Sequence, residues 1–342
     1  MRRHGNLWPK ITNVDNIYRA YLSARKGKGW QNTIKRFDRN FDENLFAIQD
    51  SLTNKTFTTS QYKEKIIYEP KKRIIYKLPF NPDRIVQHAL MNVVEPIWDA
   101  MFISDSYACR KSKGIHAGSR RTMEFIRKNK YCLKMDISRF YPSVDHDILY
   151  EIIQQKIKCP DTLWLIRDII YSCLGGKNVP IGNYTSQWFG NLYMNELDQF
   201  LKHEHKTKHY IRYCDDFCLF HNDKKWLGDM AYLIKEFLMA RLKLCLSKCD
   251  LFPVSRGVDF LGYRHFPKYI LVRKSTAKRI KRRLEKLPDM LIKGQITLDQ
   301  FRSSLASIMG WLKWANAYNL RKRLKLDELQ EILNYAQNQE TF

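Results

Sequence analysis

Apolar residues recur at the three- to four-residue spacing of one helix face in several long segments of the chain. In residues 83–99 this spacing runs through Ile85, Ala89, Val93 and Ile97. The same spacing predicts helices over residues 13–50, 186–205 and 228–244, and a helix that begins near Asp145 with Ile148, Ile152 and Ile153 facing inward.

Strand-like patterns lie between these helical segments. "KIIYEPKKRIIYKLPF" (65–80) predicts two short strands around a basic turn from Pro70 to Arg73. "YCLKMDISRF" (131–140) alternates and ends close to an aspartate, so that Cys132, Lys134 and Asp136 share one face. A third segment, "GVDFLGYRHF" (257–266), predicts a hairpin. Because hairpins outnumber parallel crossovers, the pattern favours an α+β fold with an antiparallel sheet.

The pattern changes near residue 268, where helical segments replace the mixture of strands and helices. "STAKRIKRRLEKL" has a basic face opposite Ile280, Leu284 and Leu287. We therefore expect one domain over residues 1–267 and a helical domain over residues 268–342.

Net charge narrows the choice of partner. Sixty Lys and Arg face 35 Asp and Glu, which gives a formal net charge of +25 and a pI near 9.7. The basic residues are spread along the chain with aromatic residues between them, a pattern that favours a folded nucleic-acid channel. No run of about 18 apolar residues and no signal-peptide core is present, so we expect a cytoplasmic protein without a membrane partner.

Eight cysteines raise the question of a zinc site. The pairs Cys214/Cys218 and Cys245/Cys249 lack the C-x2-C spacing that is typical of structural zinc sites. We expect buried free thiols instead.

Two neighbouring acids stand between two apolar arms in "IRYCDDFCLF" (211–220). Asp215 and Asp216 fit an ordinary hairpin turn, and they also fit a site for divalent metal, which would remove their mutual repulsion. Asp136 is a third acid at a strand end. Nucleotidyl transfer uses two divalent ions about 4 Å apart, held by carboxylates from neighbouring strand ends. This interpretation predicts two Mg²⁺ ions, with Mn²⁺ as an alternative.

Several segments together resemble reverse transcriptases. "KMDISRFYPSVDHDIL" resembles their first palm motif, "YCDD" (213–216) their Tyr-x-Asp-Asp hairpin, and "FLGY" (260–263) their primer-gripping hairpin. "DRIVQHAL" (83–90) and "SYACRKSKGIHAG" (106–118) resemble fingers segments of bacterial, group II intron-like enzymes. The resemblance implies a right-hand polymerase with fingers and palm over residues 1–267 and a helical thumb over residues 268–342.

A finer resemblance lies in "IGNYTSQ" (181–187). Most reverse transcriptases have Gln-Gly, three residues and Ser-Pro here, whereas the Ile-Gly-x-x-x-Ser-Gln form resembles enzymes of diversity-generating retroelements. That group copies a template-repeat RNA into cDNA with frequent errors at adenines, and the cDNA diversifies a target gene. The resemblance implies template RNA, cDNA, dNTPs and a small pentameric accessory variability protein as partners.

The resemblance also implies a functional role for each residue that occupies a motif position of the family. The resemblance implies that Asp136 and Asp215 are the main metal ligands, supported by Asp216 and the backbone carbonyl of Ile137. For the other site residues it implies nucleotide binding by Arg73, Lys72, Tyr141, Ile181, Gly182 and Gln187, a primer grip of Phe260, Leu261, Gly262 and Tyr263, and nucleic-acid contacts by Lys278, Arg279 and Arg282.

Some of these residues also have ordinary structural interpretations. Tyr141 fits a core aromatic, Lys72 a solvated charge and Gly182 a turn glycine before a helix. Relatives place a possible proton donor, a lysine, where this chain has Asp250, and Lys248 stands two residues earlier. We therefore assign no general acid.

Alternative functions remain open at this stage. A retron or group II intron reverse transcriptase is one, and the intron type predicts added maturase and endonuclease domains. A catalytically inactive RNA-binding scaffold predicts the loss of at least one of the three acids, yet all three are present. A two-metal nuclease would not require the fingers segments or the basic helices.

Overall fold

The computed structural model describes residues 3–68, 72–173, 175–329, 331 and 333. The chain forms two compact units, each built from three separate segments. The first unit contains residues 1–110, 135–217 and 229–249, and the second contains residues 111–134, 218–228 and 250–342.

The first unit begins with a helical layer. The short helix α1 (Trp8–Ile11) precedes α2 (Val14–Arg25), and α3 (Asn32–Arg39) and α4 (Phe41–Thr53) follow. The Asn13 side chain accepts hydrogen bonds from the backbone N–H groups of Asp15 and Asn16, which fixes the start of α2. The predicted helical segment 13–50 is thus three helices, separated by short turns.

Helix α5 (Ile85–Asp99) packs against α2 and follows a π-helical turn at Phe80–Arg84. Its predicted core face is only partly right. Ile85 and Ala89 are buried as expected, but Val93 and Ile97 are half-buried, and Val94 and Trp98 take their places in the core. A strict four-residue repeat drifts around a helix of 3.6 residues per turn, so its later members rotate away from the core.

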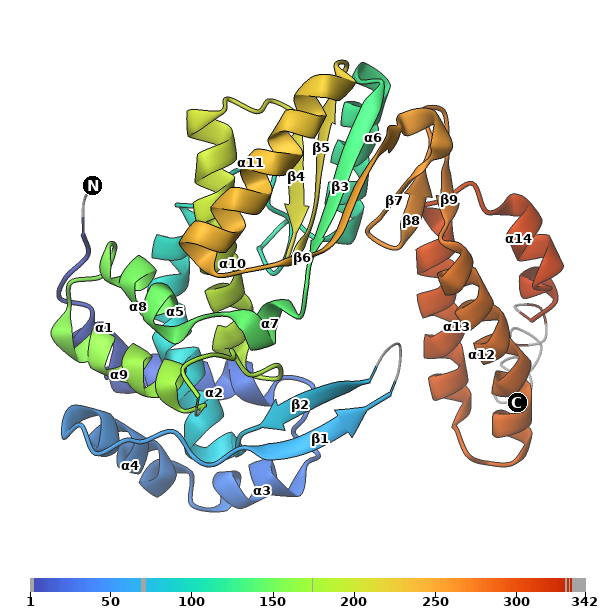
Figure 1. Cartoon of the computed structure of the whole chain (residues 1–342). Helices are drawn as coiled ribbons and strands as arrows, with labels where there is room; N and C mark the ends of the chain where they lie inside the picture. The colour runs from blue at the N-terminus through green and yellow to red at the C-terminus, as the bar shows by residue number, and fades with distance from the viewer. Residues whose placement is uncertain (1–2, 69–71, 174, 330, 332, 334–342) are drawn as a thin grey trace. The chain divides into compact units, whose positions relative to one another are not determined.

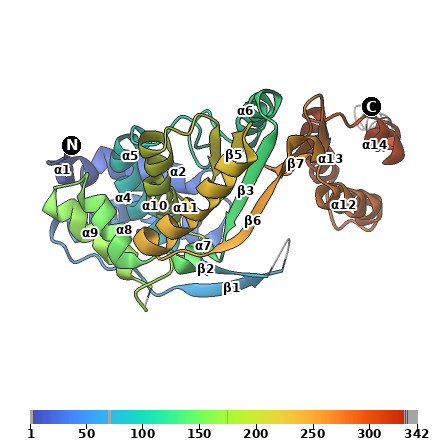
Figure 2. The same ribbon diagram turned by 45° about the horizontal axis from the view of Figure 1, so that its top comes forward.

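Strands β1 (Lys63–Ile67) and β2 (Arg73–Lys77) form an antiparallel two-stranded ribbon, which confirms the two predicted strands (Figures 1 and 2). Ile66 pairs with Ile74, and Ile67 pairs with Arg73. Of the predicted turn, Pro70 and Lys71 lie outside the described residues.

Four strands form the main sheet in the order β4-β5-β3-β6, with β6 at the edge beside β3 (Figure 2). Their bounds are Tyr131–Ile137 for β3, Tyr210–Tyr213 for β4, Asp216–His221 for β5 and Leu246–Pro253 for β6. The remaining helices of the first unit are α7 (Phe140–Ser143), α8 (His146–Gln154), α9 (Pro160–Tyr171), α10 (Tyr184–Gln199) with a π-helical end at Phe200–Glu204, and most of α11 (Lys224–Leu242). Asp145 caps α8 by accepting from Ile148 N, as the predicted helix start requires.

The second unit contains α6 (Ile115–Lys128) and a three-stranded antiparallel sheet in the order β7-β8-β9. Strands β7 (Val258–Phe260) and β8 (Tyr263–His265) are the predicted hairpin, and a short 3-10 turn at Val254–Arg256 precedes them. Strand β9 (Ile270–Val272) was not predicted, because three residues are too few to show alternation.

Helices α12 (Lys274–Ile292), α13 (Leu298–Lys313) and α14 (Tyr318–Arg323) complete the second unit. Ile280, Leu284 and Leu287 of α12 are buried in one cluster with α13, as their spacing predicts. The proposed domain boundary near residue 268 stays a prediction.

All eight cysteines are free thiols. The expectation that they are buried is confirmed for Cys132, Cys159, Cys173 and Cys218. It is wrong for Cys109 and Cys214, which are half-buried, and for Cys245 and Cys249, which are exposed. Cys245 and Cys249 belong to the segment around β6, which is an edge strand of the main sheet among the described residues. Among the described helices, none combines the length and apolar character that crossing a membrane would require.

Candidate functional site

The turn between β4 and β5 contains Asp215 and lies beside the end of β3, which carries Asp136. Only Cys214 and Asp215 separate the strands, and Cys214 has a positive φ of 54°, which closes the tight turn. The backbone N–H of Ile137 donates to the carbonyl of Asp215 at 3.4 Å. This contact ties the end of β3 to the turn, so Asp136 and Asp215 come from neighbouring strand ends, and Asp216 starts β5.

The electrostatics of Asp215 reflect this position. Burial raises the pKa of its carboxyl group above the usual range, and the negative charge of Asp136 raises it further, against the lowering effects of its own backbone hydrogen bond, Arg73 and Arg212. Asp136 is held by Ser247, whose Oγ donates to Asp136 Oδ2 at 2.8 Å. Sequence reasoning missed Ser247, since a lone serine in a strand carries no signal.

The two carboxylates fit a hard divalent cation. Their charges repel each other at a partly buried site, and a bound cation would remove that repulsion. In the described ranges, His, Cys, Asp and Glu side chains form no group of three or more that could hold a metal ion. Mg²⁺ in phosphoryl-transfer sites commonly uses one or two carboxylates and takes its other ligands from water and substrate phosphates.

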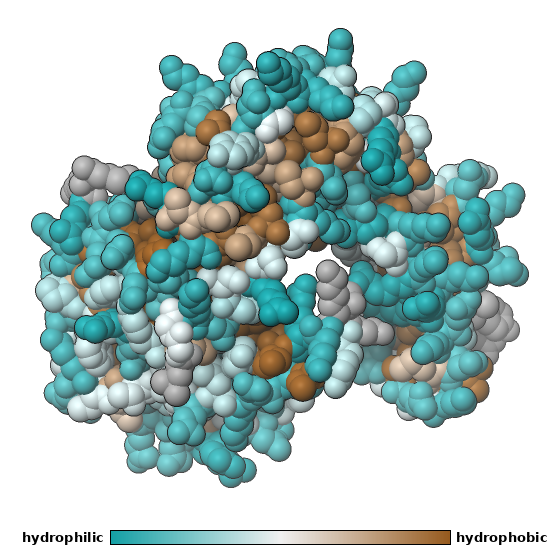
Figure 3. All heavy atoms as spheres, in the orientation of Figure 1, coloured by the Kyte–Doolittle hydropathy of each residue, from teal (hydrophilic) through white to brown (hydrophobic). Residues whose placement is uncertain are grey.

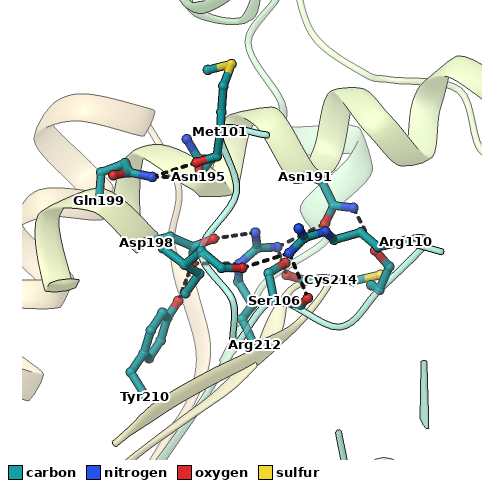
Figure 4. Close-up of polar contacts among 12 residues, drawn as sticks. Met101, Ser106, Arg110, Asn191, Asn195, Asp198, Gln199, Tyr210, Arg212 and Cys214 are labelled. Atoms are coloured by element: carbon teal, nitrogen blue, oxygen red, sulfur yellow. Dashed lines mark hydrogen bonds and ion pairs between the residues drawn. The ribbon is translucent and has the colours of Figure 1, made fainter. Parts of the chain in front are cut away.

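A buried ion pair between Arg212 and Asp198 holds the turn between β4 and β5 in place (Figure 4). Arg212 and Asp198 are both fully buried, and they join through Nη2–Oδ2 at 2.6 Å and Nε–Oδ1 at 2.8 Å. Arg212 Nη1 also donates to the Cys214 carbonyl at 2.9 Å, and Tyr210 OH donates to Asp198 Oδ1 at 2.7 Å. The guanidinium therefore connects α10 to the backbone of the acidic turn.

This network was also missed from the sequence, although a signal exists. Asn191, Asn195 and Asp198 form a polar stripe at helical spacing in an otherwise apolar helix, and all three are buried. A buried polar stripe requires partners, and a buried Arg on an adjacent strand is the natural one.

Four predicted nucleotide-binding residues line one pocket of about 370 Å³ in the first unit. These residues are Tyr141, Ile181, Gly182 and Gln187. Burial raises the pKa of Tyr141 well above its ordinary value, so its hydroxyl stays protonated. A β-carbon on Gly190 would lie 3.2 Å from the Tyr141 ring, which shows how closely α10 packs beside it.

Ile181 and Gly182 lie against β2. The Tyr76 N–H donates to the Ile181 carbonyl at 2.8 Å, and a β-carbon on Gly182 would lie 2.5 Å from the Tyr76 carbonyl oxygen. Gly182 has a φ of 124°, which side chains rarely permit. This close approach sets the distance between the pocket wall and the strand that starts with Arg73.

Gly182→Ala is therefore expected to lower the melting temperature by several degrees. The substitution combines a strained backbone, which costs about 1–3 kcal/mol, with a clash against backbone atoms. Thermal unfolding measures the effect. Gly228→Ala is the matched control, because Gly228 is helical and a β-carbon there meets nothing within 4 Å. Equal melting temperatures for the two variants would contradict the prediction.

Residues 62–265 match the family described as reverse transcriptase (RNA-dependent DNA polymerase). The chain belongs to the reverse transcriptase family. The predicted α+β right-hand polymerase fold is thereby confirmed, with the described helices and antiparallel strands as its elements.

Individual relatives are distant. Protein YkfC of Escherichia coli (strain K12) is 24% identical, over 55% of this chain and 61% of that protein. Group II intron-encoded protein LtrA of Lactococcus lactis subsp. cremoris is 23% identical, over 57% of this chain and 35% of LtrA. The match thus spans less than two thirds of either relative. Among solved structures, telomerase from Candida albicans in complex with a fragment of telomeric RNA has a TM-score of 0.48 at 12% identity, covering 79% of this chain and 60% of that one.

The primer-gripping hairpin expected of a reverse transcriptase lies in the second unit, at the turn between β7 and β8. Phe260 and Tyr263 are fully buried, and the turn residues Leu261 and Gly262 have positive φ values of 55° and 82°. A β-carbon on Gly262 would lie 2.7 Å from the Trp311 ring. The buried aromatics thus hold the hairpin, and its role as a primer grip stays a prediction.

The basic residues predicted for this reverse transcriptase's thumb lie on the outer face of α12. Lys278, Arg279 and Arg282 are exposed, and no carboxylate within the described ranges lies at ion-pair distance from them.

Lys72 and Arg73 are exposed at the start of β2 in the first unit. Hydrophilic side chains cover most of the face drawn in Figure 3. Lys248 and Asp250 are exposed around β6, and the general acid stays unassigned.

Proposed function

We propose that this chain is an RNA-directed DNA polymerase that extends a primer along an RNA template. The observation that carries the proposal is the pairing of Asp136 and Asp215 at adjoining strand ends, in the same unit as a pocket lined by Tyr141 and Ile181. Family membership supports the same reaction.

The proposed roles follow from the side chains. Asp136, Asp215 and the Ile137 carbonyl would hold Mg²⁺, with Asp216 in support. When bound, the ions supply Lewis-acid activation of the primer 3′-hydroxyl and charge stabilisation of the departing pyrophosphate. Arg73 is exposed and acts electrostatically on Asp215, a position suited to holding the triphosphate. Tyr141 packs under the incoming sugar and excludes a 2′-hydroxyl.

A primer-extension assay tests the proposal. Purified protein, poly-rA template, oligo-dT primer, dTTP and Mg²⁺ should give extended DNA, and omission of Mg²⁺ should remove the product. A scaffold protein would bind the template without extension, and a nuclease would shorten it. Either outcome contradicts the proposal.

The subtype that the sequence favours is a reverse transcriptase of a diversity-generating retroelement. Ile181 and Gln187 line the same pocket, which supports a direct effect of both on the nascent base pair. The enzyme would copy a template-repeat RNA with errors at adenines, together with a pentameric accessory protein. A group II intron type is the second candidate, favoured by the similarity to LtrA.

Ile181→Gln is expected to lower misincorporation opposite template adenine several-fold while activity persists. Isoleucine offers no hydrogen bond to a correct pair, and one hydrogen bond contributes about 0.5–1.5 kcal/mol, or about two- to thirteen-fold in discrimination. Sequencing of cDNA made on an adenine-rich template measures the change. Ile181→Leu is the apolar control and should keep the wild-type error rate. An unchanged error rate in Ile181→Gln would show that Ile181 does not cause the errors, and Gln187 would be the next position to change.

Charge reversal of Lys278, Arg279 and Arg282 to Glu is expected to flatten the salt dependence of RNA binding. Each phosphate contact contributes a slope of roughly 0.7–0.9 in log K against log salt. Processivity should fall before single-nucleotide addition does. The matched control reverses Lys224, Lys225 and Lys235, three exposed lysines of α11. If both triple variants show the wild-type slope, α12 does not bind nucleic acid.

A further inference from the structure

The nucleotide pocket is also lined by residues that none of the assigned roles uses. These are Lys28, from the segment after α2, and Arg84, Gln87 and His88, from the residues around the start of α5. Gln87 is only 2% exposed. A buried amide at the edge of a cavity needs partners for both its oxygen and its nitrogen.

Contacts fix the orientation of the Gln87 amide. The backbone N–H of Tyr184 points at Oε1 at 3.2 Å. Because a backbone N–H can only donate, the atom that faces it is the oxygen, and Nε2 is left as the donor. Nε2 is buried and has no hydrogen-bond partner among the residues that the structure describes. An acceptor on a ligand in the pocket would satisfy it.

The surroundings of Gln87 are positively charged. Burial, Lys28 and Arg84 lower the pKa of His88 to about 4, so its ring is neutral at physiological pH. The ring stacks on Tyr184, with centroids 4.2 Å apart and an angle of 15° between the planes. Two cations beside a neutral donor match the phosphates and the polar edge of a nucleotide.

The lining also identifies which nucleotide fits. Asp136, Asp215 and Arg73, which would hold the metal ions and the incoming triphosphate, do not line this pocket, whereas Ile181, Gly182 and Gln187 do. Tyr141, which the proposed function places under the incoming sugar, lines it as well, so the pocket borders the incoming nucleotide without reaching the triphosphate site. An occupant that contacts the nascent pair but not the triphosphate site is the templating partner.

We propose that Gln87 is a specificity-determining residue that donates from Nε2 to an acceptor of the template nucleotide, with Lys28 and Arg84 on the template phosphates. The inference rests on the proposed polymerase function. Two acceptors share this chemistry: the ribose 2′-hydroxyl, and the minor-groove acceptor of the base, which is N3 in a purine.

Single-nucleotide addition on three templates tests the inference. The templates are identical except for adenosine, 2′-deoxyadenosine or 3-deazaadenosine at the templating position. Gln87→Glu keeps an acceptor for Tyr184 N–H and removes the donor, and Gln87→Met removes the donor without adding charge. Gln199→Glu is the matched control, because its Nε2 already donates to the Met101 carbonyl at 3.0 Å and to Asn195 Oδ1 at 3.1 Å.

Wild type should lose kcat/KM on one of the two modified templates, by about two- to thirteen-fold. Both Gln87 variants should show a similar loss on adenosine and no further loss on that modified template. A loss on 2′-deoxyadenosine assigns the ribose, and a loss on 3-deazaadenosine assigns the base.

The inference is overturned if wild type treats all three templates alike, or if the Gln87 variants lose the same factor on every template, total inactivity included. It is also overturned if Gln199→Glu reproduces their pattern. A wild-type protein that extends no primer at all contradicts the proposed function, and the inference with it.

Discussion

Asp215→Asn is expected to reduce dNTP incorporation by about 100-fold or more while RNA affinity stays within a few-fold of wild type. The substitution keeps shape and volume but removes a hard anionic ligand, and metal-ion stabilisation contributes several kcal/mol to the transition state. RNA affinity should hold or rise slightly, because one negative charge near the phosphates is gone. Primer extension and a filter-binding titration measure the two quantities side by side.

Asp136→Asn should behave in the same way, since the charge of Asp136 acts on Asp215 at the same site. Asp229→Asn is the control for the chemical change, because Asp229 is exposed on α11. Extension at near wild-type rate by either active-site variant would show that the acids serve only the turn.

Arg212→Met is expected to lower the free energy of unfolding by about 3–5 kcal/mol. It leaves the fully buried Asp198 carboxylate without a cation and removes the donor to the Cys214 carbonyl. Denaturant unfolding measures the loss, and primer extension should fall as well because the acidic turn loses its support.

Arg321→Met is the matched control for Arg212→Met. The Arg321–Asp327 pair has a similar separation of 2.8 Å, but both side chains are solvent-exposed, so about 0–1 kcal/mol is expected. Comparable losses in the free energy of unfolding would show that the buried pair contributes no more to stability than the exposed pair. A double variant with Asp198→Leu should recover part of the loss, since paired removal leaves no isolated buried charge.

The sequence predicted the helices and strands whose apolar residues recur at a regular spacing. The β1–β2 ribbon, the β7–β8 hairpin and the long helices follow from alternation or helical spacing. It failed where the period is too short to see, as in β9, or where burial depends on neighbours, as for Cys245 at a sheet edge.

The candidate site divides in the same way. Asp136 and Asp215 could be predicted because charged residues at the ends of apolar strands are conspicuous. Ser247 and Gln87 could not, because each gains its importance from a partner far away in the chain. Asp198 was missed although the polar stripe that it forms with Asn191 and Asn195 is a signal. A contact between residues about 110 positions apart, such as Ser247 with Asp136, leaves no mark on local patterning.

The interleaving of the two compact units has a consequence for dissecting the protein. Each unit is assembled from three stretches of sequence, and β3, β5 and β6 each begin in one unit and end in the other. A deletion that starts at residue 250 would remove α12 and α13 together with the β7–β9 sheet but leave α6 behind without its packing partner β8. Neither unit can be expressed alone as a continuous fragment, and exchange of parts with a relative would require circular permutation or several simultaneous crossovers. The pairing of such distant segments also predicts slow, cooperative folding of the whole chain.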